Sequence, residues 1–305
     1  MLRYWLLLTV AALTLHAETH YLAISGLGGE PEYDQRFAGW ASDLTKPLQN
    51  EPNAKVDSLV GKDATKANIE VKLRALATTA KAGDNFVLLL IGHGSFDLDY
   101  KFNIPGPDLS ATELAAMLDK IPAQQVIVNM TSSSGGMIPA LQKPKRVVVT
   151  ATKAGTEKNA TIFARYFIES LRDASTDTDK NDAISALEAF RYAEQKTSKF
   201  FETQKRLATE HALIEDTGKG EGVKTPSPEN GQGIIANRVN LLHLGAVASY
   251  VNNPEKQKLL KQKEDLEASI DQLKYQKAAM DPREYRGQLQ KFLLELAKTQ
   301  EALDK

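Results

Sequence analysis

Two loops in this sequence carry side chains that could take part in catalysis. The first holds His93 between two glycines, directly after the apolar run 86–91. The second begins with Thr131-Ser132, directly after the largely apolar run 126–130, and continues as Ser-Ser-Gly-Gly. An imidazole can act as a general base toward a serine, whose hydroxyl is too weakly acidic to attack without one. The sequence therefore predicts a histidine–serine pair. The alternative is that each side chain only packs within its own loop.

Strands and helices alternate along the part of the chain that holds these loops. Strands are expected at 21–27, 56–60, 86–91, 126–130 and 146–151, with helices at 34–48, 65–81, 110–119, 162–171 and 184–203. This order is typical of an α/β sandwich around a mainly parallel sheet. Because such sheets bind ligands at the carboxyl ends of their strands, the His93 and Ser132 loops are expected at one edge of the sheet.

The two loops resemble those of the caspase-like clan of cysteine peptidases, in particular the legumain-like family and its bacterial secreted relatives. In that family a His-Gly follows one central strand and a Cys-x-Ser-Gly follows the next. Here His93-Gly94 and the Ser132 loop stand 39 residues apart, with one expected helix between them. The resemblance covers about residues 21–193 and implies a three-layer caspase-like sandwich. If the pair were catalytic, with Ser132 as nucleophile and His93 as base, the Gly94 amide could donate to an oxyanion.

The sequence departs from the family at the nucleophile. Ser132 stands where the family has its cysteine, and the chain contains no cysteine. A thiol is partly ionised near neutral pH, whereas a serine hydroxyl needs a closely aligned base. We therefore expect a catalytically degenerate site, a pseudoenzyme. The alternative is an active endopeptidase that uses a Ser132–His93 dyad.

Three further residues bear on this site through the same resemblance. The segment Tyr33-Asp34-Gln35-Arg36 is similar to the part of legumain-like enzymes that holds an orienting asparagine and a specificity-pocket arginine. The resemblance implies that Asp34 could hold the His93 imidazole and that Arg36 binds substrate. Ser133 replaces an acidic residue that follows the family's cysteine, which argues against an asparagine-specific pocket. From the residues alone, Asp34 and Arg36 equally suit a solvent-facing helical turn.

A second constellation has the ligand spacing of an EF-hand calcium loop. Residues 177–188 place oxygen donors at the loop positions that bind Ca²⁺ in EF-hands. These donors are the side chains of Asp177, Asp179, Asn181, Ser185 and Glu188 and the carbonyl of Ala183. Asp182 stands where the usual glycine allows a left-handed backbone, which aspartate also tolerates. The sequence therefore predicts that these residues bind a structural calcium ion. The alternative is that Ser185 and Glu188 form only a capping box and that the acidic residues form a solvated loop.

Composition and the N-terminal residues narrow the class of protein to which this chain could belong. The chain has 305 residues, 42% hydrophobic and 25% charged, with a net charge of −1, which suits a globular protein and argues against nucleic-acid binding. Residues 1–17 have the basic start, apolar run and small final residue of a secretory signal peptide. An uncleaved anchor or a buried strand would be the alternatives. We expect no transmembrane segment after cleavage and an exported protein, periplasmic or extracellular.

The last part of the chain has a different pattern. Asn253-Pro254 marks a boundary that separates the caspase/legumain-like region, 18–253, from 254–305. Apolar residues recur there at seven-residue and four–three spacing, and Asp281-Pro282 can start a second helix. Residues 254–305 are therefore expected to form an antiparallel, coiled-coil-like helical hairpin. The hairpin would pack on itself or on the domain, or form a homo-oligomer or hold a partner.

These expectations combine into one function and two alternatives. The preferred function is that of an exported, catalytically degenerate peptidase-fold protein that binds a polypeptide in the former substrate cleft. Calcium would stabilise residues 177–188. The alternatives are the active endopeptidase and an envelope scaffold or assembly protein that acts through residues 254–305.

Overall fold

The computed structural model describes residues 17–245, 247, 250 and 253–305. The signal peptide prediction therefore lies outside the described residues, apart from its last position, Ala17. Among the described residues, no helix is both long and apolar enough to cross a membrane.

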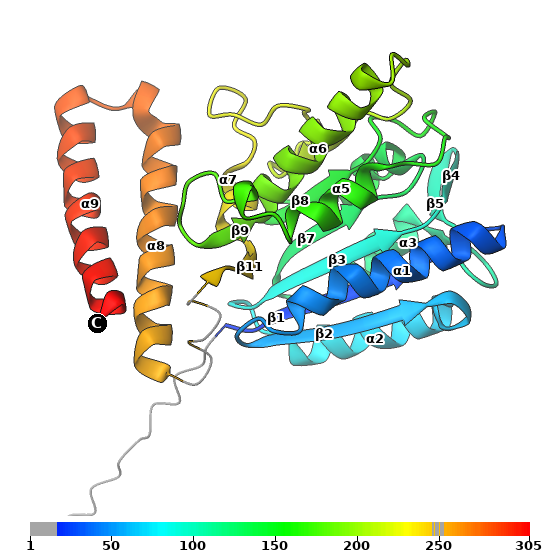
Figure 1. The fold of residues 1–305 in the computed structure, drawn as a ribbon, viewed down its shortest axis with the longest axis horizontal. Coiled ribbons are helices and arrows are strands. Elements are labelled where there is room, and N and C mark those ends of the chain that lie inside the picture. Colours follow the sequence, from blue (N-terminus) through cyan, green and yellow to red (C-terminus); the bar gives the residue numbers. More distant parts are fainter. Residues whose placement is uncertain (1–16, 246, 248–249, 251–252) are drawn as a thin grey trace, which may run out of the picture.

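A six-stranded sheet forms the centre of the molecule (Figure 1). In spatial order its strands are β10 (Leu213–Glu215), β8 (Arg146–Thr150), β7 (Gln124–Asn129), β3 (Asn85–Ile91), β1 (Thr19–Ser25) and β2 (Ala54–Val60). Neighbouring strands are parallel except for β10, which runs antiparallel to β8. Strand β3 is apolar and buried along almost its whole length, as expected where helices cover both faces of a parallel sheet.

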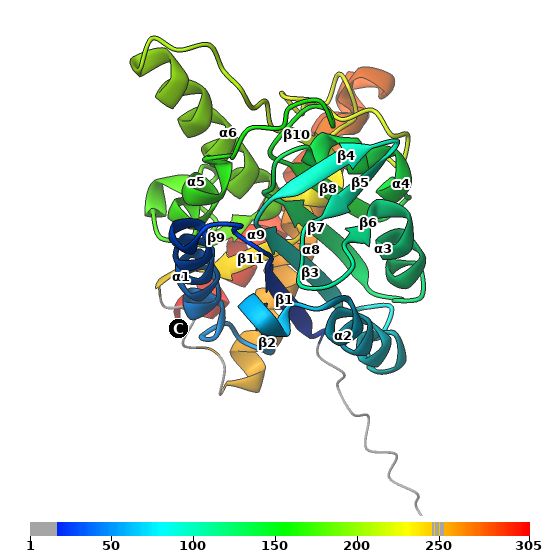
Figure 2. The same cartoon turned by 90° about the vertical axis from the view of Figure 1, so that its right-hand side faces the viewer.

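Helices cover both faces of this sheet (Figure 2). One face carries α1 (Pro31–Leu48), α5 (Phe163–Ser170) and α6 (Ala186–Thr203). The other carries α2 (Lys66–Thr79), α3 (Ala111–Leu118) and α4 (Ile138–Leu141). Successive residues of β3 alternate between the two apolar cores, with Val87 in one and Leu88 in the other. The predicted three-layer α/β sandwich with a mainly parallel sheet is confirmed.

Local signals fix where several helices begin. Ser110 accepts a hydrogen bond from the Glu113 amide, and the Glu113 carboxylate accepts one from Ser110, so the predicted capping box at α3 is confirmed. Ser185 and Glu188 form the same motif at α6. The expected helix 184–203 was too long by two residues, because Ala183–Ser185 forms a short strand, β9, with an extended Ser185 as N-cap.

Two small sheets were not predicted. One joins β4 (Gly94–Asp97), β5 (Asp99–Phe102) and β6 (Leu109–Ser110) after the His93 loop. The other pairs β9 with β11 (Asn240–His243) in antiparallel orientation. These strands are two to four residues long, too short for a period of two to be recognised in the sequence.

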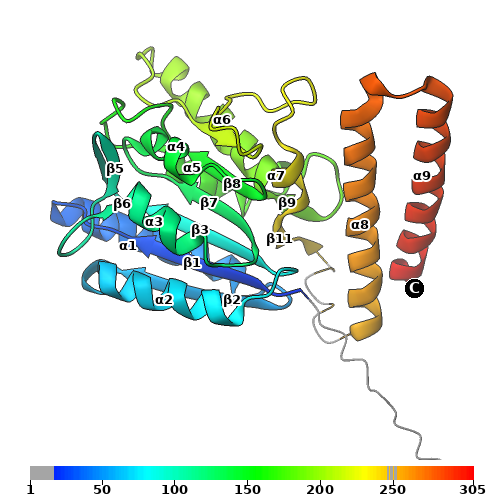
Figure 3. The same cartoon turned by 180° about the vertical axis from the view of Figure 1, so that it is seen from behind.

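The C-terminal helices form the predicted hairpin (Figures 1 and 3). Helix α8 (Pro254–Gln276) lies beside the sandwich, and α9 (Pro282–Asp304) packs on its outer side, after a short turn at η5 (Lys277–Ala279). Asp281 caps α9 as predicted. Lys263, which interrupts the apolar seam in the sequence, is buried and donates to the Asn181 carbonyl at 2.9 Å. The lysine thus joins the hairpin to the sandwich.

His243 provides a second polar connection between distant elements. Its Nδ1 lies 2.7 Å from Glu51 after α1, and its Nε2 lies 2.9 Å from Glu264 on α8. Burial alone would lower the pKa of His243, but the hydrogen bonds and negative charges of Glu264 and Glu51 raise it to about 10. The imidazolium therefore holds two carboxylates that come from opposite ends of the chain.

We predict that this ion triad makes the free energy of unfolding fall as the pH rises into the alkaline range. The folded pKa of His243, about 10, exceeds the unfolded value of about 6.5, so the stabilisation is complete below pH 6.5 and is lost as pH rises to about 10. His243→Gln should lower the free energy of unfolding at pH 7 by roughly 3 kcal/mol, because two carboxylates lose their cation. Urea denaturation at several pH values measures both effects. The same pH dependence in wild type and His243→Gln would contradict the assignment.

Candidate functional site

The His93 and Ser132 loops meet at the carboxyl edge of the sheet, as predicted. Strand β3 ends at Ile91 and its neighbour β7 ends at Asn129. The two loops are in direct contact, because a Cβ atom on Gly94 would lie 2.6 Å from the Ser132 carbonyl oxygen. Only a glycine fits at this crossing.

Ser132 is locked into this contact. Its side chain is buried, and its Oγ donates a hydrogen bond to the Gly94 carbonyl at 2.9 Å. The same Oγ accepts a hydrogen bond from the Gly94 amide at 3.1 Å. Both the hydroxyl proton and the amide expected to stabilise an oxyanion are therefore occupied by one structural interaction.

His93 has other partners. The imidazole is half-buried, and its ring centre lies 4.9 Å from that of Tyr33 and 5.1 Å from that of Phe37, both in edge-on geometry. Burial lowers the pKa of His93, while a hydrogen bond to the backbone of Gly28 opposes this shift. Between residues 17 and 245 no hydrogen bond joins His93 to Ser132. The imidazole is thus positioned by α1 and the Gly28 loop.

Asp34 and Arg36 lie on the first turns of α1 near this histidine. The expectation that Asp34 holds the His93 imidazole directly differs from the structure, in which the Asp34 carboxylate accepts the Gly28 amide at 2.7 Å. Asp34 therefore acts on His93 only through the backbone of Gly28, to which the imidazole is hydrogen-bonded. Arg36 is exposed, pairs with Glu32 at 2.5 Å and lies 4.9 Å from the centre of the Tyr33 ring. Its guanidinium is therefore accessible to a ligand at this edge.

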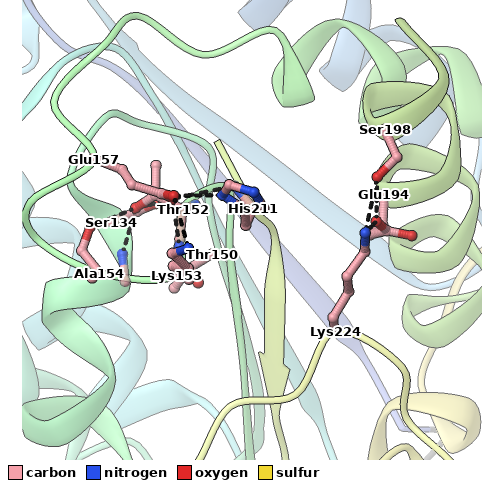
Figure 4. Close-up of polar contacts among 11 residues, drawn as sticks. Ser134, Thr150, Thr152, Lys153, Ala154, Glu157, Glu194, Ser198, His211 and Lys224 are labelled. Carbon is pink, nitrogen blue, oxygen red and sulfur yellow. Dashed lines mark hydrogen bonds and ion pairs between the residues drawn. The ribbon is translucent and has the colours of Figure 1, made fainter. Parts of the chain in front are cut away.

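The two serines after Ser132 are buried within the loop and do not reach its surface. Ser133 is fully buried with a left-handed backbone, φ 58°, and donates its amide to Glu157 at 2.8 Å. Its Oγ has no hydrogen-bond partner within the described chain. Ser134 Oγ accepts the Thr152 amide at 3.1 Å, joining this loop to the one after β8 (Figure 4). Burial therefore removes Ser133 from direct substrate contact.

The pairing of Glu157 with His211 was not predicted from the sequence. His211 Nδ1 lies 2.5 Å from Glu157 Oε1, beside the serine loop (Figure 4). The neighbouring Glu210 accepts the amides of Ile162 and Phe163 at the start of α5. Burial raises the pKa of Glu210 to about 7, although both amides oppose the shift. Because 54 residues separate Glu157 from His211, local spacing could not have predicted the pair.

The predicted calcium ligands are brought together in part. Oxygen atoms of Asp177, Asp179 and Glu188 all lie within 4.8 Å of one another. Asp182 has φ 66°, the left-handed conformation that the loop requires at the glycine position. The side chains of Asn181 and Ser185 make internal hydrogen bonds, to the Ala183 amide at 2.9 Å and to Glu188 at 2.9 Å. Calcium binding would require both side chains to exchange these contacts.

Negative charge accumulates where this loop faces α8. Desolvation, followed by the charges of Glu188 and Asp177, raises the pKa of Asp179 to about 6. Desolvation also raises the pKa of Glu267 on α8 to about 7, with Lys263 opposing the shift and Asp179 adding to it. A divalent cation in the loop would relieve this repulsion and strengthen the contact with the hairpin.

A hollow of about 520 Å³ lies between the ends of α8 and α9, remote from these groups. Its lining includes Lys256, Lys298 and Glu301. It contains none of the residues predicted for catalysis or metal binding, so the hollow and the histidine–serine edge are separate features.

Comparisons with known proteins found distant similarity to solved structures. No protein-family model matches the sequence, and a search of curated proteins gave no match. Among solved structures, a Geobacter sulfurreducens protein is 13% identical, with a TM-score of 0.49 over 75% of this chain and 99% of that one. Caspase-1 from Spodoptera frugiperda is 12% identical, with a TM-score of 0.45 over 66% and 87%. The Drosophila initiator caspase Dronc is 12% identical, with a TM-score of 0.42 over 68% and 81%. Matches at this level carry no information about activity.

We predict that Ser132 contributes to stability and that its neighbour does not. Ser132→Ala should lower the free energy of unfolding by about 1–3 kcal/mol, because the partly buried amide and carbonyl of Gly94 lose their partner. Ser133→Ala is the matched control and should not lower the free energy of unfolding, because the buried Ser133 Oγ has no hydrogen-bond partner among the described residues to lose. Urea denaturation of the two variants measures the difference. Equal losses of stability in the two variants would show that the hydrogen bonds between Ser132 and Gly94 do not stabilise the fold.

We also predict calcium binding that weakens in acid. Calorimetric titration should give heat with the wild type, and Asp177→Ala or Glu188→Ala should abolish it. Below about pH 6 the affinity should fall roughly tenfold per pH unit, because calcium must displace the proton on Asp179. Asp57→Ala, which removes an exposed carboxylate on β2, is the control. Equal heats in all four proteins would exclude a site at residues 177–188.

Proposed function

We propose that this chain is a catalytically silent member of the caspase/legumain-like fold that binds an extended polypeptide at the carboxyl edge of its sheet. The observation that carries the proposal is the double hydrogen bond between Ser132 Oγ and the Gly94 backbone. A nucleophile must present a lone pair to its substrate and pass its proton to a base. Here the hydroxyl donates its proton to the Gly94 carbonyl, and within the described part of the chain no hydrogen bond joins His93 to Ser132.

The occupied amide supports the same conclusion. Acyl transfer requires donors that are free to receive the charge that develops on the substrate oxygen. Gly94 is the residue for which this role was predicted, and Ser132 itself uses its amide. Catalysis would require both hydrogen bonds to break before substrate could bind. A cysteine, which is a weak hydrogen-bond donor, would be held less firmly at this position.

Two features of the same edge suit a polypeptide ligand. Strand β4 begins at Gly94 and is an edge strand of its small sheet, so an extended peptide could pair with it. Ser95 and Asp97 on this strand are exposed. Arg36 offers an accessible guanidinium beside Tyr33 for an acidic side chain of the peptide. His93, whose pKa is lowered by burial, lies at the same edge against Tyr33 and Phe37.

Calcium and the hairpin complete the proposal. Calcium at residues 177–188 would hold the loop against α8 by neutralising Asp179 and its neighbours. The hairpin itself is a second candidate site for a partner, since Leu293 and Leu294 on α9 are 49% and 56% exposed. Export remains part of the proposal on the strength of residues 1–17.

We predict that the protein binds peptides without cleaving them. Neither the wild type nor Ser132→Ala should cleave a peptide library, with or without calcium. Arg36→Ala should weaken binding of the captured acidic peptides by about tenfold, because one charge-assisted contact is lost. Arg165→Ala is the matched control, because this exposed arginine lies over Tyr166 in the same way. Fluorescence anisotropy measures the affinities.

Two outcomes would overturn this function. Cleavage that disappears in Ser132→Ala would establish an active endopeptidase with Ser132 as nucleophile. No peptide capture at all, together with loss of self-association or partner capture on deletion of 254–305, would favour the assembly function.

A further inference from the structure

A second cluster of metal-binding side chains lies at the opposite edge of the sheet, away from His93 and Ser132. Glu18 directly precedes β1, His20 is the second residue of that strand, and Asp84 directly precedes β3. One ligand atom from each lies within 4.8 Å of the others. Because β1 and β3 pair in parallel with Thr19 opposite Asn85, the register itself places Glu18 beside Asp84.

The buried Nε2 of His20, which has no hydrogen-bond partner among the described residues, points to a ligand. Its side chain is 5% exposed, and its Nε2 makes no hydrogen bond with any described residue. This nitrogen is directed at the carboxylates, 3.7 Å from Glu18 Oε2 and 3.7 Å from Asp84 Oδ2, beyond hydrogen-bonding distance. A buried polar nitrogen without a partner is unfavourable, and a cation between the three groups would satisfy it.

The separations match a metal centre. Bonds of about 2.0–2.2 Å from a tetrahedral Zn²⁺ to nitrogen and oxygen place two ligands about 3.3–3.6 Å apart. Both distances from His20 Nε2 are 3.7 Å, so small side-chain adjustments bring all three atoms to one ion. An imidazole with two carboxylates suits first-row divalent cations better than Ca²⁺ or Mg²⁺, which prefer oxygen alone.

The surroundings hold the ligands in place. The carbonyls of Glu18 and Asp84 accept the Asn85 and Gln124 amides, each at 2.9 Å, which fixes the backbone of both residues. The Asp84 carboxylate accepts the amides of Glu18 at 3.0 Å and Lys81 at 2.8 Å, which fixes its orientation. Lys55 pairs with Glu18 Oε2 at 2.5 Å, and its exposed ammonium would have to yield that oxygen.

We propose that Glu18, His20 and Asp84 form a structural site for a first-row divalent cation, with Zn²⁺ as the ion of best fit. Glu18 is 39% exposed on its side chain, which leaves an open path for entry and a fourth position for water. The ion would join the amino ends of β1 and β3, two central strands of the sheet. Its effect would be on stability rather than on the His93 edge.

Zinc titration of the full-length protein against a chromophoric chelator tests the site. Calcium is kept in excess so that residues 177–188 do not compete for zinc. The wild type should bind one equivalent, and His20→Ala and Glu18→Gln should each weaken binding at least about tenfold. His211→Ala is the matched control, because it removes another imidazole that lies beside a carboxylate. It should leave the affinity unchanged.

Two further measurements complete the test. The Tm of the wild type should rise with zinc, and this rise should disappear in His20→Ala. If His20→Ala does not fold, Glu18→Gln decides, together with the visible absorption of the Co²⁺-loaded wild type, which reports a nitrogen–oxygen site of low coordination number. Absence of a zinc equivalent, unchanged affinity in Glu18→Gln, or loss of binding in His211→Ala would overturn the proposal.

Discussion

The contact between Ser132 and Gly94 determines what the carboxyl edge of the sheet can do. Parallel pairing of β3 with β7 brings the two loops to the same edge, and the missing side chain of Gly94 lets them touch. One hydroxyl then satisfies both backbone groups of Gly94. A loop arrangement that suits an acyl-transfer site is thereby held as a structural contact. A serine hydroxyl both donates and accepts hydrogen bonds well, which explains why one side chain can satisfy both groups.

Away from this edge, buried charges connect parts of the molecule that apolar packing alone would leave separate. His243 joins Glu51 to Glu264, and Lys263 joins α8 to the loop at Asn181. Both connections tie the hairpin to the sandwich through groups that are costly to bury alone. The acidic loop at 177–188 lies at the same junction. Cation binding there would therefore act on the position of the hairpin, whereas the cluster at Glu18 would act on the sheet.

The sequence predicted the large elements because their signals are local. Apolar runs gave the central strands, and Ser110 with Glu113 gave the start of α3. The meeting of the His93 and Ser132 loops followed from the properties of parallel sheets. The roles of Asp34 and Ser133 could not be predicted in the same way. Asp34 acts through the Gly28 amide, and Ser133 is buried by its left-handed backbone. Both depend on loop geometry. The pairing of Glu157 with His211 and the cluster at Asp84 depend on tertiary contacts between remote positions.

The central claim is that the Ser132 hydroxyl is not available as a nucleophile. Labelling with a fluorophosphonate, which reacts with activated serines, tests this claim most directly. Intact-mass measurement followed by peptide mapping reads out the site. We predict no adduct on Ser132 in the wild type, in the presence or absence of calcium. An adduct on Ser132 that disappears in His93→Ala would show a working dyad and contradict the account.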